Sequence, residues 1–383
     1  MKILVLGAGR MGRGAAYDLA RSVEVHEVTV ADLSLDNAAR VVASVNNSKV
    51  SAAAVDVLDY SRVVDLMSGH DAAISCVVYK HNLLLARAAI EAGTNFCDLG
   101  GNNKVVEAEF ALDEQARQAG INIIPDCGLA PGMVSVLAAH GAARFESLES
   151  IHIRVGGLPQ RPTGPLKYQI VFSVEGLINE YVEPARVIRA GQVTEVEAMS
   201  DLELLEFPPF GTMEAFQTSG GASSLPESFL GRVRDLDYKT IRYPGHCEQF
   251  RLLIELGLTS NEPLSVAGAA LAPRSMLEEL LLRRLPIEGP DVVLVHIGFQ
   301  GIIAGEHQTL TYRIIDYYDE GTSLSAMTRT TAFPASIIAQ MMCRGDIRGK
   351  GAIPQERCVP SDLFIAALAD RGIHIAEHES VTS

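Results

Sequence analysis

The sequence predicts an α/β protein whose first part is a doubly wound parallel sheet and whose second part is an α+β domain. Over the first 125 residues, short apolar β-branched runs alternate with amphipathic helical patterns, which is typical of βαβ units. From about Ile151 the pattern becomes strand-like and irregular, and helical patterns return near the carboxyl terminus. A length of 383 residues accommodates two or three such parts.

The first part contains six predicted strands that alternate with predicted helices. The strands are short apolar runs at Lys2–Leu6, Glu27–Ala31, Val50–Val55, Ala72–Val77, Asn95–Cys97 and Ile121–Ile124. The helices are amphipathic segments at Met11–Arg21, Leu35–Val45, Ser61–Met67, Leu83–Ala92 and Val105–Ala119. Because parallel strands need crossover helices, we expect helices on both faces of this sheet and ligands beyond the carboxyl ends of its strands.

We place domain boundaries near residues 127 and 328, which gives domains over 1–127, 128–328 and 329–383. A turn-rich joint at Asp126–Gly132 leads into an apolar helix at Met133–Arg144. In the second domain we expect strands Ile151–Val155, Val292–Gln300 and Thr309–Tyr317, helices Val174–Tyr181 and Pro273–Arg283, and loops Gly156–Pro165, Phe207–Gly211 and Ser219–Pro226. In the tail we expect helices Thr331–Cys343 and Asp362–Arg371.

Composition and charge narrow the class of function. The net charge of 32 − 47 = −15 repels nucleic-acid phosphates and anionic lipids, so we expect neither a nucleic-acid nor a membrane partner. Six cysteines without a CxxC pair predict neither a disulfide framework nor a zinc site, and we expect no metal. The sequence shows no signal-peptide pattern and no apolar run long enough to span a membrane, so we expect a cytoplasmic protein.

A glycine-rich motif, Gly7-Ala8-Gly9-Arg10-Met11-Gly12, directly follows the first strand and opens a helix. In this context Gly7 permits a tight turn, Gly9 lets the backbone approach a pyrophosphate, and Gly12 lets helix and strand pack closely. The backbone N–H groups at the helix N-terminus would then bind the anion. The motif predicts a Rossmann dinucleotide-binding domain over residues 1–127, against the alternative of a glycine-rich turn without a ligand. Arg10 either lies over the pyrophosphate or is solvated.

Asp32, at the end of the second strand, indicates which dinucleotide binds. Its carboxylate would accept hydrogen bonds from the ribose hydroxyls and repel a 2′-phosphate, so we predict NAD rather than NADP. The alternative is that Asp32 only caps the following helix. Further cofactor contacts are expected where the next strands end, at Asp56, Val57, Cys76, Val77, Val78, Tyr79, Asp98, Leu99 and Gly100. Of these, Asp56 faces the adenine or is a simple helix cap, and the segment Cys76–Tyr79 runs beneath the nicotinamide half.

Several motifs resemble those of the saccharopine dehydrogenase-like oxidoreductases: GAGRMG at Gly7–Gly12, DLGG at Asp98–Gly101 and PDCGLAPG at Pro125–Gly132. The middle of the chain is similar, more narrowly, to the L-lysine 6-dehydrogenases. The segments that carry this likeness are VGGLP (Val155–Pro159), PLKY (Pro165–Tyr168), VFSVEGL (Val171–Leu177), PARVIRAG (Pro184–Gly191), EAFQTSGG (Glu214–Gly221) and YKTIRYPGH (Tyr238–His246). One departure is Ala130, where saccharopine- and carboxynorspermidine-forming enzymes generally carry an acid, which argues against those larger substrates.

The resemblance implies NAD-dependent oxidation of the ε-amine of L-lysine. The imine would hydrolyse to 2-aminoadipate 6-semialdehyde, which cyclises to a piperideine carboxylate. It also implies a homo-oligomer in which an α+β catalytic domain follows the Rossmann domain and the carboxyl-terminal segment returns to pack on the Rossmann side.

Oxidation of an amine requires a group that takes up a proton. The lysine ammonium has a pKa near 10.4, so its deprotonation at pH 7 costs about 4.6 kcal/mol. His246 is the candidate for the base or for activating the water that attacks the imine, and its alternative is a structural histidine. Asp126 could bind the substrate ammonium beside the nicotinamide, or could cap the helix region that follows.

The substrate carboxylate needs a positive partner, and the forked guanidinium of Arg242 is our candidate for it, unless it is only a surface arginine on a strand. The loop with Thr218 and Ser219 could add backbone donors, or could be a flexible turn. Tyr168 and Ser173 are expected as hydrogen-bonding walls of the pocket.

Two other functions fit the same sequence. One is a reductase of the same fold that condenses an amine with a keto acid or an aldehyde. The other is a non-catalytic regulator that only binds the dinucleotide.

Overall fold

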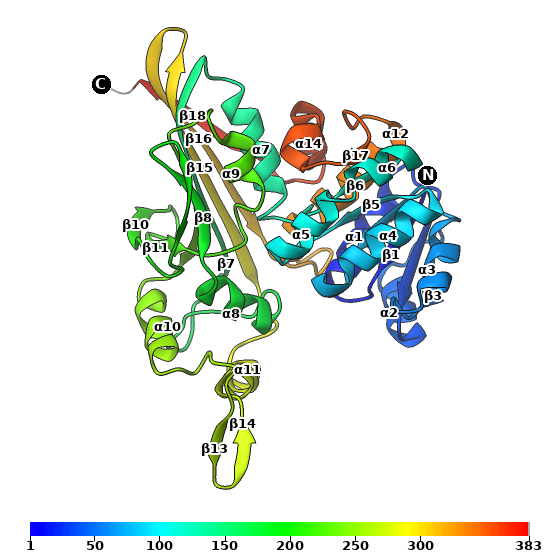
Figure 1. Ribbon diagram of the computed structural model, residues 1–383, viewed down its shortest axis with the longest axis horizontal. Coiled ribbons are helices and arrows are strands. Elements are labelled where there is room, and N and C mark those ends of the chain that lie inside the picture. The colour runs from blue at the N-terminus through cyan, green and yellow to red at the C-terminus, as the bar shows by residue number, and fades with distance from the viewer. Residues whose placement is uncertain (382–383) are drawn as a thin grey trace. The chain divides into compact units, whose positions relative to one another are not determined.

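The structure is a computed structural model that describes residues 1–381 and forms two compact units (Figure 1). Unit 1 comprises Met1–Arg144, Ser223–Ser228 and Thr328–His374, and unit 2 comprises Phe145–Ala222, Phe229–Met327 and the residues from Ile375 on. Unit 1 contains a parallel sheet and unit 2 a mixed one, which confirms the predicted α/β fold class. The predicted domain boundaries stay predictions.

The sheet of unit 1 has seven strands in the order β17-β6-β5-β4-β1-β2-β3, all parallel. Their bounds are β1 Lys2–Leu6, β2 Glu27–Asp32, β3 Val50–Ala54, β4 Ala72–Ser75, β5 Asn95–Asp98, β6 Asn122–Ile124 and β17 Gly351–Ala352. The first six lie where the sequence predicts strands. β17 was not predicted, since two residues are too short to show a periodicity. The order reverses between β1 and β4, and this switch point is where doubly wound sheets bind ligands.

Helices cover both faces of this sheet. Their bounds are α1 Arg10–Arg21, α2 Leu35–Val45, α3 Tyr60–Met67, α4 Asn82–Ala92, α5 Asn103–Phe110, α6 Asp113–Ala119, α7 Met133–Ala142, α12 Ala326–Arg344, α13 Gln355–Cys358 and α14 Ser361–Ala369, with a 3₁₀ turn η1 at Tyr79–His81. α1 packs against α2, while α3 and α5 pack against α4. α12 approaches α1 closely, because Gly14 lies against Thr328 and Ala332.

The prediction of one continuous helix over Val105–Ala119 is wrong. The chain forms α5 and α6 instead, with a break at Ala111 and Leu112. Leu112 is buried in the core, and Asp113 and Glu114 occupy the first turn of α6. Acidic residues in that position favour a new helix N-terminus through its dipole, which accounts for the break.

Unit 2 is built on a nine-stranded mixed sheet, whose path runs β10-β11-β12-β7-β15-β16-β18, with β8 beside β12 and β9 beside β8. The bounds are β7 Ser147–Pro159, β8 Ala185–Arg189, β9 Gln192–Val196, β10 Glu203–Glu206, β11 Thr212–Gln217, β12 Asp235–Arg242, β15 Asp291–Ile303, β16 Glu306–Tyr317 and β18 Ala376–Val381. Pairing is antiparallel apart from β12 with β7.

The loop predicted to start at Gly156 starts later. Gly156 and Gly157 belong to β7 and pair with Leu294 and Val293 of β15. A Cβ at Gly156 would lie 2.7 Å from the Ile241 carbonyl oxygen. The two glycines therefore reflect close packing within the sheet rather than a turn.

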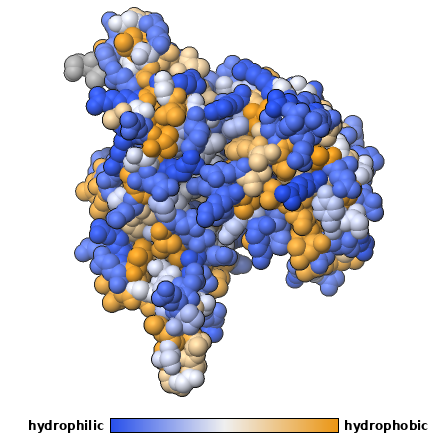
Figure 2. Space-filling view, in the orientation of Figure 1, coloured by the Kyte–Doolittle hydropathy of each residue, from blue (hydrophilic) through white to orange (hydrophobic). Residues whose placement is uncertain are grey.

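The helices of unit 2 are α8 Val174–Val182, α10 His246–Glu255 and α11 Pro273–Arg284. The short helix α9, Leu225–Phe229, lies in unit 1 except for its last residue. A separate hairpin of β13 Leu264–Val266 and β14 Ala269–Leu271 extends beyond α11 (Figure 1). Polar side chains cover most of the face in Figure 2, with apolar patches between them. Within residues 1–381, no helix has the length and apolar character that crossing a membrane requires.

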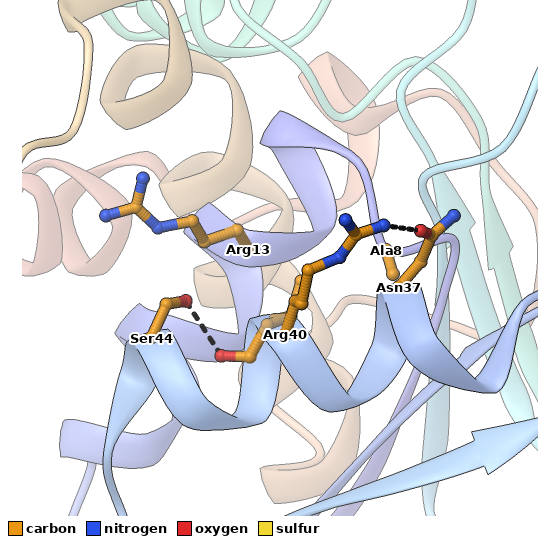
Figure 3. Close-up of a pocket in the computed structure, with 6 residues that line it drawn as sticks. Ala8, Arg13, Asn37, Arg40 and Ser44 are labelled. Atoms are coloured by element: carbon orange, nitrogen blue, oxygen red, sulfur yellow. Dashed lines mark hydrogen bonds between the residues drawn. The ribbon is translucent and has the colours of Figure 1, made fainter.

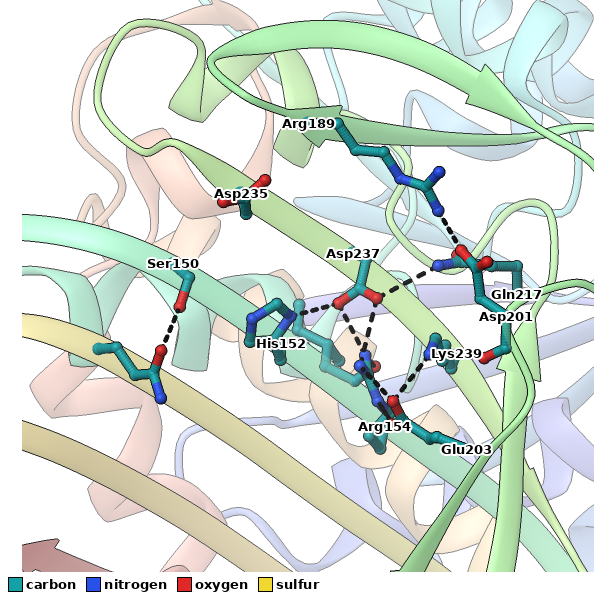
Figure 4. A network of polar contacts seen from close by, with 12 residues as sticks. Ser150, His152, Arg154, Arg189, Asp201, Glu203, Gln217, Asp235, Asp237 and Lys239 are labelled. Atoms are coloured by element: carbon teal, nitrogen blue, oxygen red, sulfur yellow. Dashed lines mark hydrogen bonds and ion pairs between the residues drawn. The ribbon is translucent and has the colours of Figure 1, made fainter.

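A network of charged side chains ties β7, β10 and β12 together on one face of the unit 2 sheet (Figure 4). Arg154 is 6% exposed and pairs with Glu203 and with Asp237, whose Oδ1 lies 2.8 Å from Nη1. Lys239 Nζ donates to Glu203 Oε2 at 2.8 Å, and His152 bonds Asp237 at 2.6 Å. Although burial opposes it, the His152 hydrogen bond and the Arg154 charge lower the pKa of Asp237. Each buried charge in this network thus has an opposite charge beside it.

Removing one member of this network leaves a buried charge without its partner. We expect Asp237→Ala to lower the free energy of unfolding by about 3 kcal/mol. The exposed pair Arg189–Asp201 is the control, and Arg189→Ala should cost at most about 1 kcal/mol. Urea unfolding followed by circular dichroism compares the two variants, and equal losses would contradict this account.

Candidate active site

The glycine-rich loop between β1 and α1 has the geometry of an anion-binding turn. Gly7 has a φ of +101°, and a Cβ there would lie 2.8 Å from the Cys76 carbonyl oxygen. A Cβ at Gly12 would overlap the Gly7 carbonyl oxygen, so close packing requires glycine at both positions. Gly9 differs, because a Cβ there would meet nothing within 4 Å. Gly9 is also the N-cap of α1 and no side chain caps that helix end, so the open backbone fits a pyrophosphate.

The Asp32 carboxylate holds this loop in place. Its Oδ2 accepts a hydrogen bond from Ala8 N at 2.8 Å, and its Oδ1 accepts one from Ser34 N at 2.9 Å. Asp32 is half-buried where β2 ends, so its negative charge is fixed beside the loop. A ligand bound to the loop would therefore meet a carboxylate whose orientation is already set.

A pocket of about 370 Å³ opens on the same side of unit 1 (Figure 3). It is lined by the loop residue Ala8, by Arg13 of α1 and by one side of α2, which contributes Asn37, Arg40, Val41 and Ser44. Arg40 donates a hydrogen bond to Asn37 Oδ1. Two guanidinium groups line this pocket, so the pocket carries positive charge close to the point where the glycine-rich loop leads into α1.

The other predicted cofactor residues lie in unit 1 at the carboxyl ends of neighbouring strands. Cys76, Val77 and Val78 follow β4, and Tyr79 begins η1. Burial raises the pKa of the Cys76 thiol above its usual range, which disfavours a thiolate there. Asp56 is exposed after β3, and its carboxylate accepts Leu58 N in a local turn. Arg10 and Met11 are the first two residues of α1, and Val57 follows Asp56.

Asp98 and Asp126 lie side by side where β5 and β6 end. Asp98 Oδ1 accepts Gly100 N at 2.6 Å and Asp126 N at 3.3 Å, and Leu99 lies between Asp98 and Gly100. Asp126 is 2% exposed and has a φ of +61°, a strained conformation for a residue with a Cβ. Its Oδ2 accepts a hydrogen bond from the Ser223 hydroxyl. Burial and the Asp98 charge raise the pKa of Asp126 to about 8, although the Ser223 hydrogen bond opposes this.

In unit 2, the structure brings three of the predicted residues together around Tyr181 of α8. The Arg242 guanidinium lies 4.9 Å from the Tyr168 ring centroid, and Arg242 Nε donates to the Tyr181 hydroxyl at 2.8 Å. The ring centroids of Tyr168 and His246 are 5.6 Å apart. Arg242 is 2% exposed, and among residues 1–381 no carboxylate lies within the 4.0 Å of an ion pair with it.

The contacts of His246 use both of its ring nitrogens. Nδ1 bonds the Leu166 carbonyl at 2.8 Å and must therefore carry the proton, which leaves Nε2 to accept from the Tyr181 hydroxyl at 3.1 Å. Burial and the Arg242 charge lower the pKa of His246 to about 3, although the Leu166 hydrogen bond opposes this. These contacts fix a neutral imidazole that has no free lone pair.

The remaining predicted residues take part in local hydrogen bonds. Ser173 is exposed and caps α8 by accepting Gly176 N at 3.0 Å. The Thr218 hydroxyl is buried and bonds the Thr240 hydroxyl at 2.7 Å. Ser219 N donates to the Glu180 carbonyl at 3.0 Å, which fastens its loop to α8.

Four residues at these places were not singled out from the sequence: Tyr181, Glu180, Ser223 and Glu109. Burial raises the pKa of Glu180 to about 7, although the Arg242 charge opposes this. Glu109 and Glu180 could have been recognised in the sequence, because each is an acid at an apolar position of a predicted helix. Ser223 gave none, because its partner lies 97 positions away in the sequence.

Comparison with known proteins assigns the family. The model of the saccharopine dehydrogenase NADP binding domain matches residues 3–124, and that of the saccharopine dehydrogenase C-terminal domain matches residues 128–373. The chain belongs to the saccharopine dehydrogenase family. Unit 1 of this family member therefore includes a domain that binds a nicotinamide cofactor, and the glycine loop described above fits such a ligand.

Two relatives align with almost the whole chain. The carboxyaminopropylagmatine dehydrogenase of Synechocystis is 23% identical over 97% of this chain and 96% of its own length. The carboxynorspermidine synthase of Vibrio cholerae is 21% identical over the same shares. The solved saccharopine dehydrogenase (L-Glu forming) of Saccharomyces cerevisiae superposes with a TM-score of 0.84 at 20% identity, covering 99% of this chain and 100% of that one. This last likeness shows that the two saccharopine dehydrogenase-type chains share one fold.

The different surroundings of Gly9 and Gly12 separate binding from folding. We expect Gly9→Ala to fold normally, because its φ of −79° suits any residue, but to weaken cofactor binding by at least about tenfold by blocking the pyrophosphate. Gly12→Ala should instead lower the melting temperature, since its Cβ would overlap the Gly7 carbonyl oxygen. Calorimetric titration with the dinucleotide measures the affinity, and thermal melts measure the stability. A Gly9→Ala variant that folds normally and binds the cofactor with unchanged affinity would contradict the assignment of this loop to the cofactor site.

Proposed function

We propose that this protein is an NAD-dependent amine dehydrogenase that oxidises the ε-amine of L-lysine to 2-aminoadipate 6-semialdehyde. Membership of the saccharopine dehydrogenase family supports a nicotinamide-dependent oxidoreductase that acts on an amine. The lysine substrate rests on the motifs in the middle of the chain and on the site of Arg242. A homo-oligomer and a cytoplasmic location stay predictions.

The observation that carries the substrate assignment is the buried Arg242 without a carboxylate partner. A charge buried in protein is stabilised only when an opposite charge or several hydrogen bonds replace its water. Glu180 lies nearby, but burial raises its pKa to about 7, so it balances the guanidinium only in part at neutral pH. The carboxylate of an amino-acid substrate fits this need, because its two oxygens match the guanidinium fork.

Asp126 is the residue we assign to accept the proton of the substrate amine. The cofactor, when bound, takes the hydride from the ε-carbon, and this requires a free lone pair on the nitrogen. Asp126 lies in the unit that contains the dinucleotide loop, and burial together with the Asp98 charge raises its pKa to about 8. This value suits a base that must exchange protons near neutral pH. His246, whose pKa is about 3 and whose nitrogens are both bonded, is better suited to holding Tyr181.

NAD is the cofactor we propose, because Asp32 is held rigidly beside the loop and would repel a 2′-phosphate. One observation favours NADP as the alternative. Arg13 and Arg40 line the pocket beside Ala8, and guanidinium groups are common partners of phosphates. The family model that matches this region is also named for NADP binding.

A second candidate function is reductive condensation of an amine with a keto acid or an aldehyde. The names of the relatives favour it, since they include a carboxynorspermidine synthase. The cofactor loop and Asp126 would serve this reaction too, because an imine formed from the amine and the carbonyl compound is reduced, and the reduced cofactor supplies the hydride. Consumption of NADH or NADPH that requires both an amine and a carbonyl compound would identify it.

Arg242 and a pair of substrates test the lysine assignment. We expect Arg242→Lys to lower kcat/KM for L-lysine by about 10- to 100-fold, since hydrogen bonds to charged groups contribute about 1.5–3 kcal/mol. The loss should fall mainly on KM. Turnover of 1,5-diaminopentane, which is lysine without its carboxylate, should be poor and nearly unchanged by the variant. NADH absorbance records both rates, and absence of any lysine turnover between pH 7 and 10 would overturn the proposal.

Two variants, Asp32→Ala and Arg40→Ala, test the cofactor assignment, and we expect only the first to change NAD binding. We expect Asp32→Ala to weaken the binding of NAD and to strengthen the binding of NADP. The ratio of their kcat/KM values should therefore shift by about tenfold or more. Arg40→Ala should leave NAD unchanged, because no phosphate of NAD needs that pocket. A wild type that prefers NADP, together with a loss of that preference in Arg40→Ala, would instead identify NADP as the cofactor.

A further inference from the structure

A third carboxyl group, Glu109 of α5, is a hydrogen-bond neighbour of Asp98 and lies close enough to Asp126 for their charges to interact. Glu109 and Asp98 are fully buried, and Asp126 is 2% exposed. Among residues 1–381, none of the three forms an ion pair with Lys, Arg or His. Three buried acids without a cation cannot all be ionised, so the group must hold protons at neutral pH.

The hydrogen bonds of Asp98 decide where one proton lies. Its Oδ1 accepts two backbone N–H groups, from Gly100 and Asp126, and both bonds favour the carboxylate. Asp98 Oδ2 and both oxygens of Glu109 have no donor, although the two side chains are hydrogen-bond neighbours. Two carboxylates have no proton to share. A single proton on Glu109 removes the conflict, because its O–H then donates to Asp98 Oδ2.

We propose that Glu109 is a positioning residue that keeps a proton, donates it in a hydrogen bond to Asp98, and so fixes one negative charge beside Asp126. This inference rests on the proposed role of Asp126 as the proton acceptor. Glu109 itself need not touch the substrate. Its effect reaches the reaction through Asp98, whose charge sets the proton affinity of the neighbouring Asp126.

The electrostatics of the neighbours agree with this order. Burial, followed by the Asp98 charge and hydrogen bond, raises the pKa of Glu109 far above its usual range. Burial and then the Asp98 charge raise the pKa of Asp126, with a smaller contribution from Glu356. The polar and titratable groups around the three acids are Cys76 after β4, Asn82 of α4, Cys127 after Asp126, Ser223, and Gln355 and Glu356 of α13. None of these groups supplies a positive charge.

Two substitutions at Glu109 separate its hydrogen bond from its bulk. In Glu109→Gln the amide N–H still donates to Asp98 Oδ2, so Asp98 stays ionised and Asp126 keeps its proton affinity. In Glu109→Leu the donor is lost, so Asp98 takes up a proton and its charge no longer acts on Asp126. The rising limb of kcat/KM against pH, near 8 in the wild type, should then move down by about one pH unit or more in Glu109→Leu and stay in place in Glu109→Gln. Glu107→Gln, on the exposed side of α5, is the control.

Thermal stability tests the proton on Glu109 without any substrate. A glutamate that is protonated in the folded chain and ionised in the unfolded one makes the folded state less stable as pH rises above about 4.3. The Glu109→Gln side chain does not titrate. The melting temperature of Glu109→Gln minus that of the wild type should therefore increase steadily between pH 6 and 9. For Glu107→Gln this difference should stay constant.

The outcomes distinguish this inference from the proposed function. A constant difference in melting temperature between Glu109→Gln and the wild type would mean that Glu109 is ionised, and would overturn the inference. A pH profile unmoved by Glu109→Leu would also overturn it. If the wild type does not oxidise lysine but the melting difference grows with pH, the proton on Glu109 stands and the proposed function fails.

Discussion

Burying a charge away from water is costly unless another group takes the place of the lost solvent, and the polar parts of both units depend on this constraint. Arg154 meets it with two carboxylates, so its network only holds strands together. Arg242 is as deeply buried but has no carboxylate in ion-pair contact among the described residues. That difference is why one guanidinium is structural and the other is a candidate for binding an anion.

The same constraint explains the acids of unit 1. Asp98 and Asp126 lie together because parallel strands end at one edge of the sheet, and Cys127 N bonds the Asp98 carbonyl at 2.7 Å. Backbone N–H groups stabilise the Asp98 carboxylate, and the other two acids form no ion pair among residues 1–381, so burial raises their pKa. A base with a raised proton affinity then arises from packing alone, in the unit that contains the dinucleotide loop.

Most elements could be predicted because their patterns are local. α2 and β1 match the predicted bounds, and the chemistry of the glycine loop follows from three residues within six positions. Several elements were missed. β17 has two residues and β18 is fully exposed, so neither shows a period, and β8 to β14, α9, α10 and α13 were not predicted either. Glycine also misled the prediction at Gly156, because a glycine needed for close packing looks like one needed for a turn.

The sequence by itself determined the first six strands of unit 1 and most of its helices, the dinucleotide loop, and which residue types could serve a reaction at an amine. Its family follows from motifs spread along most of the chain. Only the tertiary structure decided the state of those residues. His246 became a neutral histidine bonded to Tyr181, Ser173 became a helix cap, and Glu109 became a partner of Asp98. The reason is physical, since protonation depends on burial and on neighbours that are distant in sequence, and no local pattern records either.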